Sequence, residues 1–388
     1  MRRIDTAQRR ARLAERHHLT QSSRAQHPVD IARDLVGLHG TDPATVHLAA
    51  TARMTKPDVA TVERALYDER AMVRMLGMRR TVFVEALDVA PVVQAACANA
   101  IAATERRKLV QHLAQYAEGI DDPAGWLADV EQSAYRALLA RGEALGAELT
   151  ADEPRLRVKL HYKQGDLAVV TRVLFLLAAE GRLMRDRPRG SWVSSQFRWA
   201  PVDRWFPAGM PQLPADEAKV ELVRRWLTAF GPATVADLKW WTGWNLGDVK
   251  RALARLDPVE VDLDGTPGII LPTDTEPTTP PEQPWVALLP ALDPTVMGWQ
   301  HRDWYLGDHA PTLFDTNGNA GPTIWWDGRV VGGWAQRRDG EIAVTVLEDL
   351  GTDAHTAIQT EAARLTAQLG PVRVTPRFRT PLERKLSA

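Results

Sequence analysis

The chain lacks the cysteines that form disulfide frameworks and the long apolar segments that cross membranes. It has 388 residues and a single cysteine, Cys97. A disulfide framework and a thiolate zinc site are therefore excluded, which fits a reducing compartment. No apolar run approaches the length that spans a bilayer, and the basic N-terminus lacks the apolar core of a secretory signal. We therefore expect a cytoplasmic, non-membrane protein of roughly two to four domains.

An excess of one charge is also absent, because the formal net charge is −1. The charges are unevenly distributed all the same. Residues 1–28 hold seven arginines and two acidic residues, residues 151–199 hold ten basic and five acidic residues, and residues 256–284 hold seven acidic and no basic residues. Clustered basic faces suit phosphate binding, because local counterion release supplies affinity. Solvated helix faces would give the same counts, so charge alone leaves nucleic-acid binding open.

The clearest supersecondary pattern lies at residues 217–272. A helix with apolar residues at helical spacing is stopped by Gly231-Pro232, and "TVAD" at 234–237 is a capping box that opens a second helix. Asn245 caps a third helix. "VEVDL" and "IIL" then flank the turn "DGTPG" as a hairpin. Three short helices followed by a hairpin form a winged helix.

The same order recurs twice upstream. The first copy, residues 28–86, has predicted helices at 28–37, 43–54 and 58–68 and a hairpin at 71–85. The second, residues 150–200, has a strongly apolar helix at 166–180 and a hairpin at 181–195. Three matches in order favour a triplicated unit over three unrelated helix-hairpins.

The three hairpins differ in charge. The third is acidic, whereas the first two units supply a predicted DNA-binding set: Arg74, Arg79, Arg80, Lys159, Lys163, Arg182, Arg185, Arg187 and Arg189. A wing that meets phosphates should be basic, so units one and two are expected to face DNA while unit three braces them. The third unit's Trp240, Trp241 and Trp244 are then expected in core or interdomain packing.

After a Pro/Thr-rich linker at 272–284 the chain becomes rich in strands. Asp327-Gly328 and Asp339-Gly340 mark hairpins, a helix is predicted at 353–369, and "VRVTP" at 372–376 is read as a final strand. Arginines cluster here and either extend a phosphate path or form a solvated rim: Arg337, Arg338, Arg373, Arg377 and Arg379. The predicted fold class is α+β, with domains at 1–120, 121–210, 211–275 and 283–388.

Four motifs in this order carry a family resemblance. They are "GLHGTDP" at 37–43, "MRRTVFV" at 78–84, "GPATVADLKWWTG" at 231–243 and "LLPALDP" at 288–294. Over nearly its whole length the chain resembles the bacterial triple-winged-helix DNA glycosylases, the AlkZ/YcaQ family. The resemblance implies a C-shaped monomer that holds duplex DNA. It also implies hydrolytic excision of bulky alkylated purines and unhooking of interstrand crosslinks, with no metal or organic cofactor.

The family's catalytic signature, Gln-x-Gln or Gln-x-Asp, aligns here with His39 and Thr41. Breaking an N-glycosidic bond builds positive charge on the sugar, so the protein must orient a water and tolerate that charge. A neutral imidazole accepts a proton from water, and a threonine hydroxyl can orient the same water. His39 must then be neutral. A loop histidine on phosphate and a threonine bonded to its own backbone are the competing interpretations.

The neighbouring residues have simpler interpretations. Asp42 is read as an N-cap with Pro43 at the first helical position, and His47 as a residue that could support the corner from behind. A histidine metal site is conceivable, but no His-x-x-x-His pair supports it. The hairpin "MRRTVFV" is a candidate for insertion into the minor groove.

Four functions remain open from the sequence. The first is a DNA glycosylase, located in the cytoplasm at the nucleoid. The second is a non-catalytic protein that binds damaged or distorted duplex. The third is a transcription regulator, although such winged helices usually act as dimers with one reading unit each. The fourth is a protein that binds no nucleic acid, in which the charge pattern is incidental.

Overall fold

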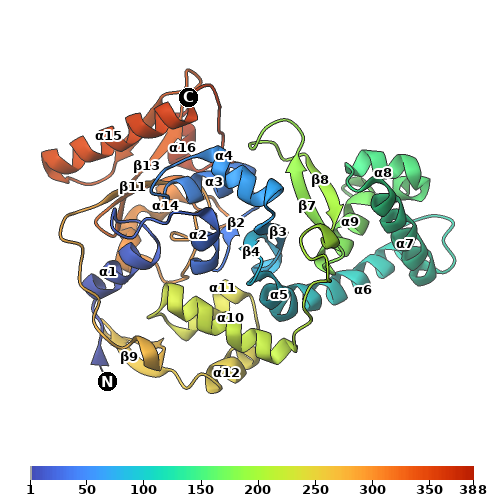
Figure 1. Cartoon of the computed structure of the whole chain (residues 1–388), viewed down its shortest axis with the longest axis horizontal. Coiled ribbons are helices and arrows are strands. Elements are labelled where there is room, and N and C mark those ends of the chain that lie inside the picture. The colour runs from blue at the N-terminus through green and yellow to red at the C-terminus, as the bar shows by residue number, and fades with distance from the viewer. Residues whose placement is uncertain (1) are drawn as a thin grey trace.

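The computed structural model describes residues 2–388 and has the predicted α+β fold class. Residues 99–201 form an arm beside a larger body, and the body contains both ends of the described chain (Figure 1). None of the helices in residues 2–388 is both long and apolar enough to cross a membrane.

The N-terminal region follows the predicted order of helices and then a hairpin. Helix α1 (Thr6–Arg16) precedes the unit, whose elements are α2 (Pro28–Asp34), β2 (Leu38–His39), α3 (Pro43–Thr51), α4 (Val59–Glu63) with a π turn (Arg64–Asp68), β3 (Met72–Leu76) and β4 (Val82–Ala86). Strand β2 was not expected. It pairs antiparallel with β4, and its His39 lies opposite Phe83.

The arm contains long helices that the sequence pattern did not reveal. Its elements, entered through α5 (Ala90–Val93) and a π turn (Gln94–Ala98), are α6 (Asn99–Tyr116), α7 (Pro123–Arg141), α8 (Gly146–Asp152), β5 (Lys159–Tyr162), β6 (Gly165–Ala168), α9 (Val170–Ala179), β7 (Leu183–Pro188) and β8 (Phe197–Pro201). The prediction of a helix from residue 166 was wrong at its start, because residues 165–168 pair with β5. The second strand of the hairpin, β8, also begins later than predicted, because it starts at Phe197 and the predicted hairpin ends at residue 195.

The hairpins of the first two units share one five-stranded sheet in the order β2-β4-β3-β7-β8. In the part of the chain that the structure describes, a single backbone pair, Arg74 with Arg185, joins β3 to β7. The hairpins of units one and two therefore belong to one continuous sheet, which the sequence did not reveal. Within "MRRTVFV", Met78, Phe83 and Val84 are buried, so the strand part of this hairpin is not free to enter a DNA groove.

The third unit has α10 (Ala215–Phe230), α11 (Val235–Thr242), α12 (Leu246–Ala254), β9 (Val259–Leu263) and β10 (Thr266–Ile270), close to the prediction. The capping box is confirmed, since the Thr234 hydroxyl accepts from the Asp237 backbone N–H at 3.0 Å. Trp241 lies in the core, and Trp240 and Trp244 pack partly buried against it, as predicted.

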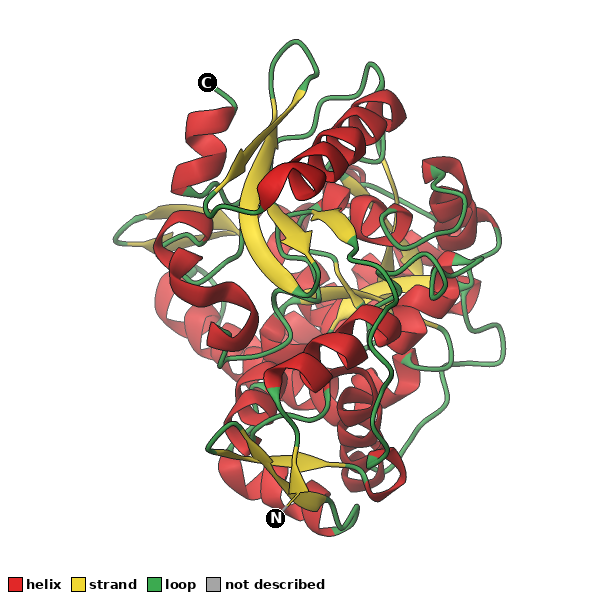
Figure 2. Ribbon diagram, turned by 90° about the vertical axis from the view of Figure 1, so that its left-hand side faces the viewer, coloured by secondary structure: helices red, strands yellow, loops and turns green. Residues whose placement is uncertain are grey.

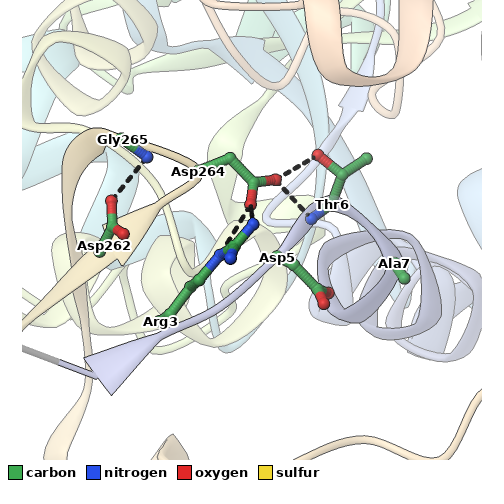
Figure 3. Close-up of a pocket in the computed structure, with 7 residues that line it drawn as sticks. All are labelled: Arg3, Asp5, Thr6, Ala7, Asp262, Asp264 and Gly265. Carbon is green, nitrogen blue, oxygen red and sulfur yellow. Dashed lines mark hydrogen bonds and ion pairs between the residues drawn. The ribbon is translucent and has the colours of Figure 1, made fainter.

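The acidic hairpin of this unit binds the start of the chain. Strand β1 (Arg2–Arg3) pairs parallel with β9, and Arg3 forms a 2.9 Å ion pair with Asp264. Asp264 also accepts from the backbone N–H and the hydroxyl of Thr6, both at 2.8 Å (Figure 3). The negative charge therefore has an intramolecular partner, which agrees with a bracing role.

The C-terminal region is a four-stranded sheet, β11 (Val286–Leu289), β12 (Thr323–Trp326), β13 (Arg329–Gln336) and β14 (Ile342–Val346), with helices beside it (Figure 2). The helices are α13 (Asp303–Leu306), α14 (Ala310–Leu313), α15 (Gly351–Leu369) and α16 (Pro381–Leu386). The predicted final strand at 372–376 was wrong. The Gln336 side chain bonds Val372 O and Val374 N, replacing a backbone ladder.

Candidate active site

The corner at residues 36–43 is shaped by a reversal of the backbone. Val36 and Gly37 have φ of +51° and +95°, the left-handed region that turns the chain from α2 into β2. A Cβ on Gly37 would lie 2.3 Å from a carboxylate oxygen of Glu85, so only glycine fits. Gly40 N–H then donates to Val82 O at 2.7 Å. The corner is thus attached to β4 on both sides of His39.

Asp42 ends the corner as the predicted N-cap of α3. Its carboxylate accepts from Ala44 N–H at 3.0 Å, and Pro43 occupies the first helical turn. The second oxygen accepts from Arg377 N–H at 2.9 Å. The C-terminal segment is thereby held against the corner, a contact that the sequence did not reveal.

The His39 side chain is almost enclosed, with 5% of its surface exposed. Its ring lies 5.2 Å from the Phe83 ring, and its Nδ1 is buried with no hydrogen-bond partner within residues 2–388. Burial, assisted by the charge of Arg79, lowers the pKa of His39 to about 3. The imidazole is therefore neutral at physiological pH, as the proposed chemistry requires. Thr41, two residues on, is half-buried.

His47 lies on the following helix turn and is fully buried. Its Nδ1 contacts Pro43 O at 3.2 Å, and its ring packs 5.1 Å from that of Trp192. Burial lowers its pKa to about 3 as well. Trp192 belongs to the β7–β8 loop and packs in the same apolar cluster as Leu288 of the C-terminal sheet. This histidine therefore packs under the corner, behind the residues proposed for chemistry.

Two predicted arginines lie nearest the corner. Arg74, 2% exposed, donates to Gly40 O at 2.7 Å. Arg79 stacks 4.1 Å from the Trp240 ring, which also contacts Arg302 at 4.9 Å. Arg79 and Arg80 both have positive φ and form a strained pair of residues in the β3–β4 turn. Arg80 is ion-paired with Glu105 at 2.8 Å.

The remaining predicted DNA-binding residues do not form one cluster. Arg185 lies opposite Arg74 in the shared sheet, whereas Arg182 stacks 4.5 Å from Tyr135 on α7. Arg187 is ion-paired with Asp68 at 2.7 Å, and Lys159 with Asp166 at 3.3 Å. Lys163 and Arg189 are exposed.

Sequence reasoning overlooked Glu85, which lies behind the corner. It is fully buried, and neither carboxylate oxygen has a partner among residues 2–388. Burial raises the pKa of Glu85 to about 8, so the group is mostly protonated at neutral pH. An isolated Glu in an apolar strand gives no sequence signal for this state.

Replacing Glu85 with glutamine is expected to stabilise the protein increasingly as the pH rises from 5 to 8. The unfolded chain releases the proton near 4.5, whereas the folded chain retains it up to about 8. Each pH unit in this window therefore costs the native state about 1.4 kcal/mol, and Gln has no such proton. Melting temperatures of E85Q and wild type test this, with exposed Glu118→Gln as control. A difference that does not change with pH would contradict it.

The described residues contain no group of three or more His, Cys, Asp or Glu positioned to hold a metal ion.

The fold has a counterpart among DNA-repair enzymes of known structure. The chain superposes on the Streptomyces sahachiroi DNA glycosylase AlkZ with a TM-score of 0.73, covering 97% of this chain and 99% of that one. Sequence identity is 20%, so this likeness establishes the fold.

The family follows from a match that includes the corner. The model of the family described as DNA glycosylase AlkZ-like matches residues 32–368, and the chain belongs to this family. A curated relative, the interstrand DNA cross-link repair glycosylase of Streptomyces sahachiroi, is 28% identical over 222 residues. That match spans 53% of this chain and 57% of the relative, little more than half of either.

Proposed function

We propose that this chain is a monofunctional DNA glycosylase that hydrolyses the N-glycosidic bond of bulky alkylated purines or unhooks interstrand crosslinks. The observation that carries the proposal is the neutral imidazole of His39, with an unpartnered buried Nδ1, at a corner within the family match. A buried polar atom without a partner costs free energy, and use of the atom in catalysis is one explanation for its retention. His47 Nε2 is also buried without a partner, so the position of His39 within the family match is what distinguishes it.

In the proposed reaction, one water attacks C1′ of the deoxyribose while the C1′–N9 bond breaks. The bonding electrons go to the purine. An N7-alkylguanine carries a positive charge, so it leaves neutral without needing a proton. The imidazole of His39 takes the proton of the water and later releases it to solvent, leaving an abasic site. The Thr41 hydroxyl orients the water.

Arg79 has a proposed role in binding the substrate. A lone positive charge beside a forming sugar cation would oppose the reaction, whereas a DNA phosphate next to the guanidinium neutralises it. Arg79 is largely buried against Trp240, and this burial, with the charge of Arg302, lowers its pKa to about 10. It remains charged at neutral pH and is proposed to contact the phosphate backbone near the lesion.

The test is an incubation with duplex DNA that carries one N7-alkylguanine with a bulky substituent, or one nitrogen-mustard crosslink. Abasic sites, revealed by alkaline cleavage at the lesion, are the expected product. Duplex of the same sequence without the lesion is the control. Tight binding to the lesion without abasic sites would refute the enzymatic proposal and favour the second candidate.

That second candidate is a non-catalytic protein that binds damaged duplex. The replacement of the family's Gln-x-Gln or Gln-x-Asp by His39 and Thr41 is the observation that favours it. A transcription regulator is the less favoured alternative. We further propose that the chain acts on double-stranded DNA as a monomer, without metal or cofactor, at the nucleoid in the cytoplasm.

The rate of abasic-site formation is expected to be flat between pH 8 and pH 5. With a pKa of about 3, His39 stays an acceptor throughout this range, whereas an ordinary histidine would lose the acceptor form below about 6.5. Single-turnover rates at half-unit pH intervals measure the profile, and circular dichroism at each pH checks that the protein is folded. A fall of about fivefold between pH 6.5 and 5.5 in folded protein, as a histidine with a pKa near 6.5 would give, would contradict this state of His39.

A further inference from the structure

Three arginines from three parts of the chain meet beside the corner. Arg74 comes from β3, Arg185 from β7 and Arg377 from the segment before α16. Arg74 and Arg185 are directly opposite in the sheet, and Arg377 is fixed nearby by its backbone bond to Asp42. Arg74 is buried, Arg185 half-buried and Arg377 exposed, so positive charge leads from the interior to the surface.

These charges lack the partners that arginines normally have. Within residues 2–388 no carboxylate forms an ion pair with Arg74, Arg185 or Arg377, whereas Arg187, two residues along the same strand, is paired with Asp68. The Nε and one terminal nitrogen of Arg74 are buried without a hydrogen bond. The Phe197 ring is next to both Arg74 and Arg185, and its centroid lies 4.5 Å from the guanidinium carbon of Arg74 and 5.8 Å from that of Arg185.

Such an arrangement is unfavourable in the free protein. Like charges directly opposite across two strands repel, and buried guanidinium nitrogens lose their water without a replacement. The pKa of Arg185 is lowered to about 10 by burial and by the charges of Arg74 and Arg377. An anion bound by the half-buried Arg185 and the exposed Arg377 would neutralise both charges, and it would also offset the charge of Arg74, which is too deeply buried to touch it.

We infer that Arg185 and Arg377 form a seat for one phosphate of the DNA backbone next to the lesion nucleotide, with the charge of the buried Arg74 behind them. The inference rests on the proposed function, because it names the part of the substrate that lies beside His39. Arg74 donates to Gly40 O, so the positive charge behind this seat is fixed to the backbone of the corner. The Arg377 contribution makes the C-terminal region part of the DNA-binding surface.

The test measures binding rather than cleavage, using intact full-length protein and variants that spare Arg74. Arg185→Met and Arg377→Met are each expected to flatten the plot of log affinity against log salt by up to about 0.9, the value for one phosphate contact. The double variant should flatten the slope by less than the sum of the two single variants, because both side chains contact one phosphate. Arg198→Met removes an arginine of the neighbouring strand β8 that is ion-paired with Glu143 at 2.8 Å, and it should leave the slope unchanged. Equal flattening by Arg198→Met, or none by Arg185→Met, would overturn the seat.

A second arm locates the phosphate on the DNA. Neutral methylphosphonates are placed one at a time along the lesion strand. One position next to the lesion is expected to weaken binding by wild type but not by the double variant. If no position behaves in this way, the inference is overturned. It is also overturned if inorganic phosphate raises the melting temperature only when both arginines are present, while the salt dependence of DNA binding does not depend on them. Neither experiment requires cleavage of the DNA. If the phosphate seat is found but the protein forms no abasic sites, the proposal of a glycosylase is refuted and the inference of a phosphate seat stands.

Discussion

His39→Ala is expected to reduce the rate of abasic-site formation about 10²-fold, the lower end of the usual contribution of a general base, because a group with a pKa of about 3 is a weak base at neutral pH. Affinity for the lesion duplex should change little, because the imidazole is 5% exposed and its charge is absent. Single-turnover cleavage and fluorescence anisotropy on the same duplex separate the two quantities.

Two matched variants sharpen this result. His39→Gln places the amide of the family signature at the same position and should retain more activity than His39→Ala. His47→Phe removes the other neutral, buried histidine of this region and should leave the chemical step within a few-fold of wild type. If His39→Ala forms abasic sites as fast as wild type, His39 is not the base and Thr41 becomes the residue to examine.

The second large effect is an expected loss of stability, at the buried ion pair of Arg53 and Asp293. Both side chains are completely buried and joined by two bonds of 2.6 and 2.8 Å. Arg53 also donates to His17 O at 3.0 Å and to the Thr295 hydroxyl at 2.8 Å. The pair therefore fastens α1, the end of α3 and the start of the C-terminal region to one another.

Asp293→Ala should destabilise the protein by about 3–5 kcal/mol, because it leaves a guanidinium buried without its counter-ion. Loss of soluble protein or a large fall in melting temperature is the expected observation. Arg3→Ala breaks the exposed ion pair with Asp264 and provides the comparison, since exposed pairs contribute about 0–1 kcal/mol. If the two variants lower the melting temperature equally, the buried pair contributes no more to stability than the exposed pair.

The sequence predicted local features well, because they depend on neighbouring residues. The capping box at Thr234, the Asp42 cap and the helix at 353–369, observed as Gly351–Leu369, all follow from short-range hydrogen bonds and apolar spacing. "LLPALDP" was recognised only as a family motif. Its Asp293 has a physical role that became visible once Arg53, 240 residues away, was located.

Contacts between distant segments account for most of what was missed. Pairing of β3 with β7 leaves no periodic signal, so the sequence did not reveal that the two hairpins share a sheet. Gly165–Ala168 were assigned to a helix because the apolar run of α9 begins directly afterwards. At the site, His39 and Thr41 were found through family alignment, whereas Arg377 joins the corner by a bond to Asp42 across 335 residues.

The sheet that joins the two hairpins also limits how far they can move apart. Units on a flexible tether would be free to change their spacing. Here hydrogen-bonded strands run in one sheet from β2 to β8, so Arg74 on β3 and Arg185 on β7 keep a fixed separation. For the proposed DNA glycosylase, the consequence is that the duplex rather than the protein adapts when an adduct distorts the DNA.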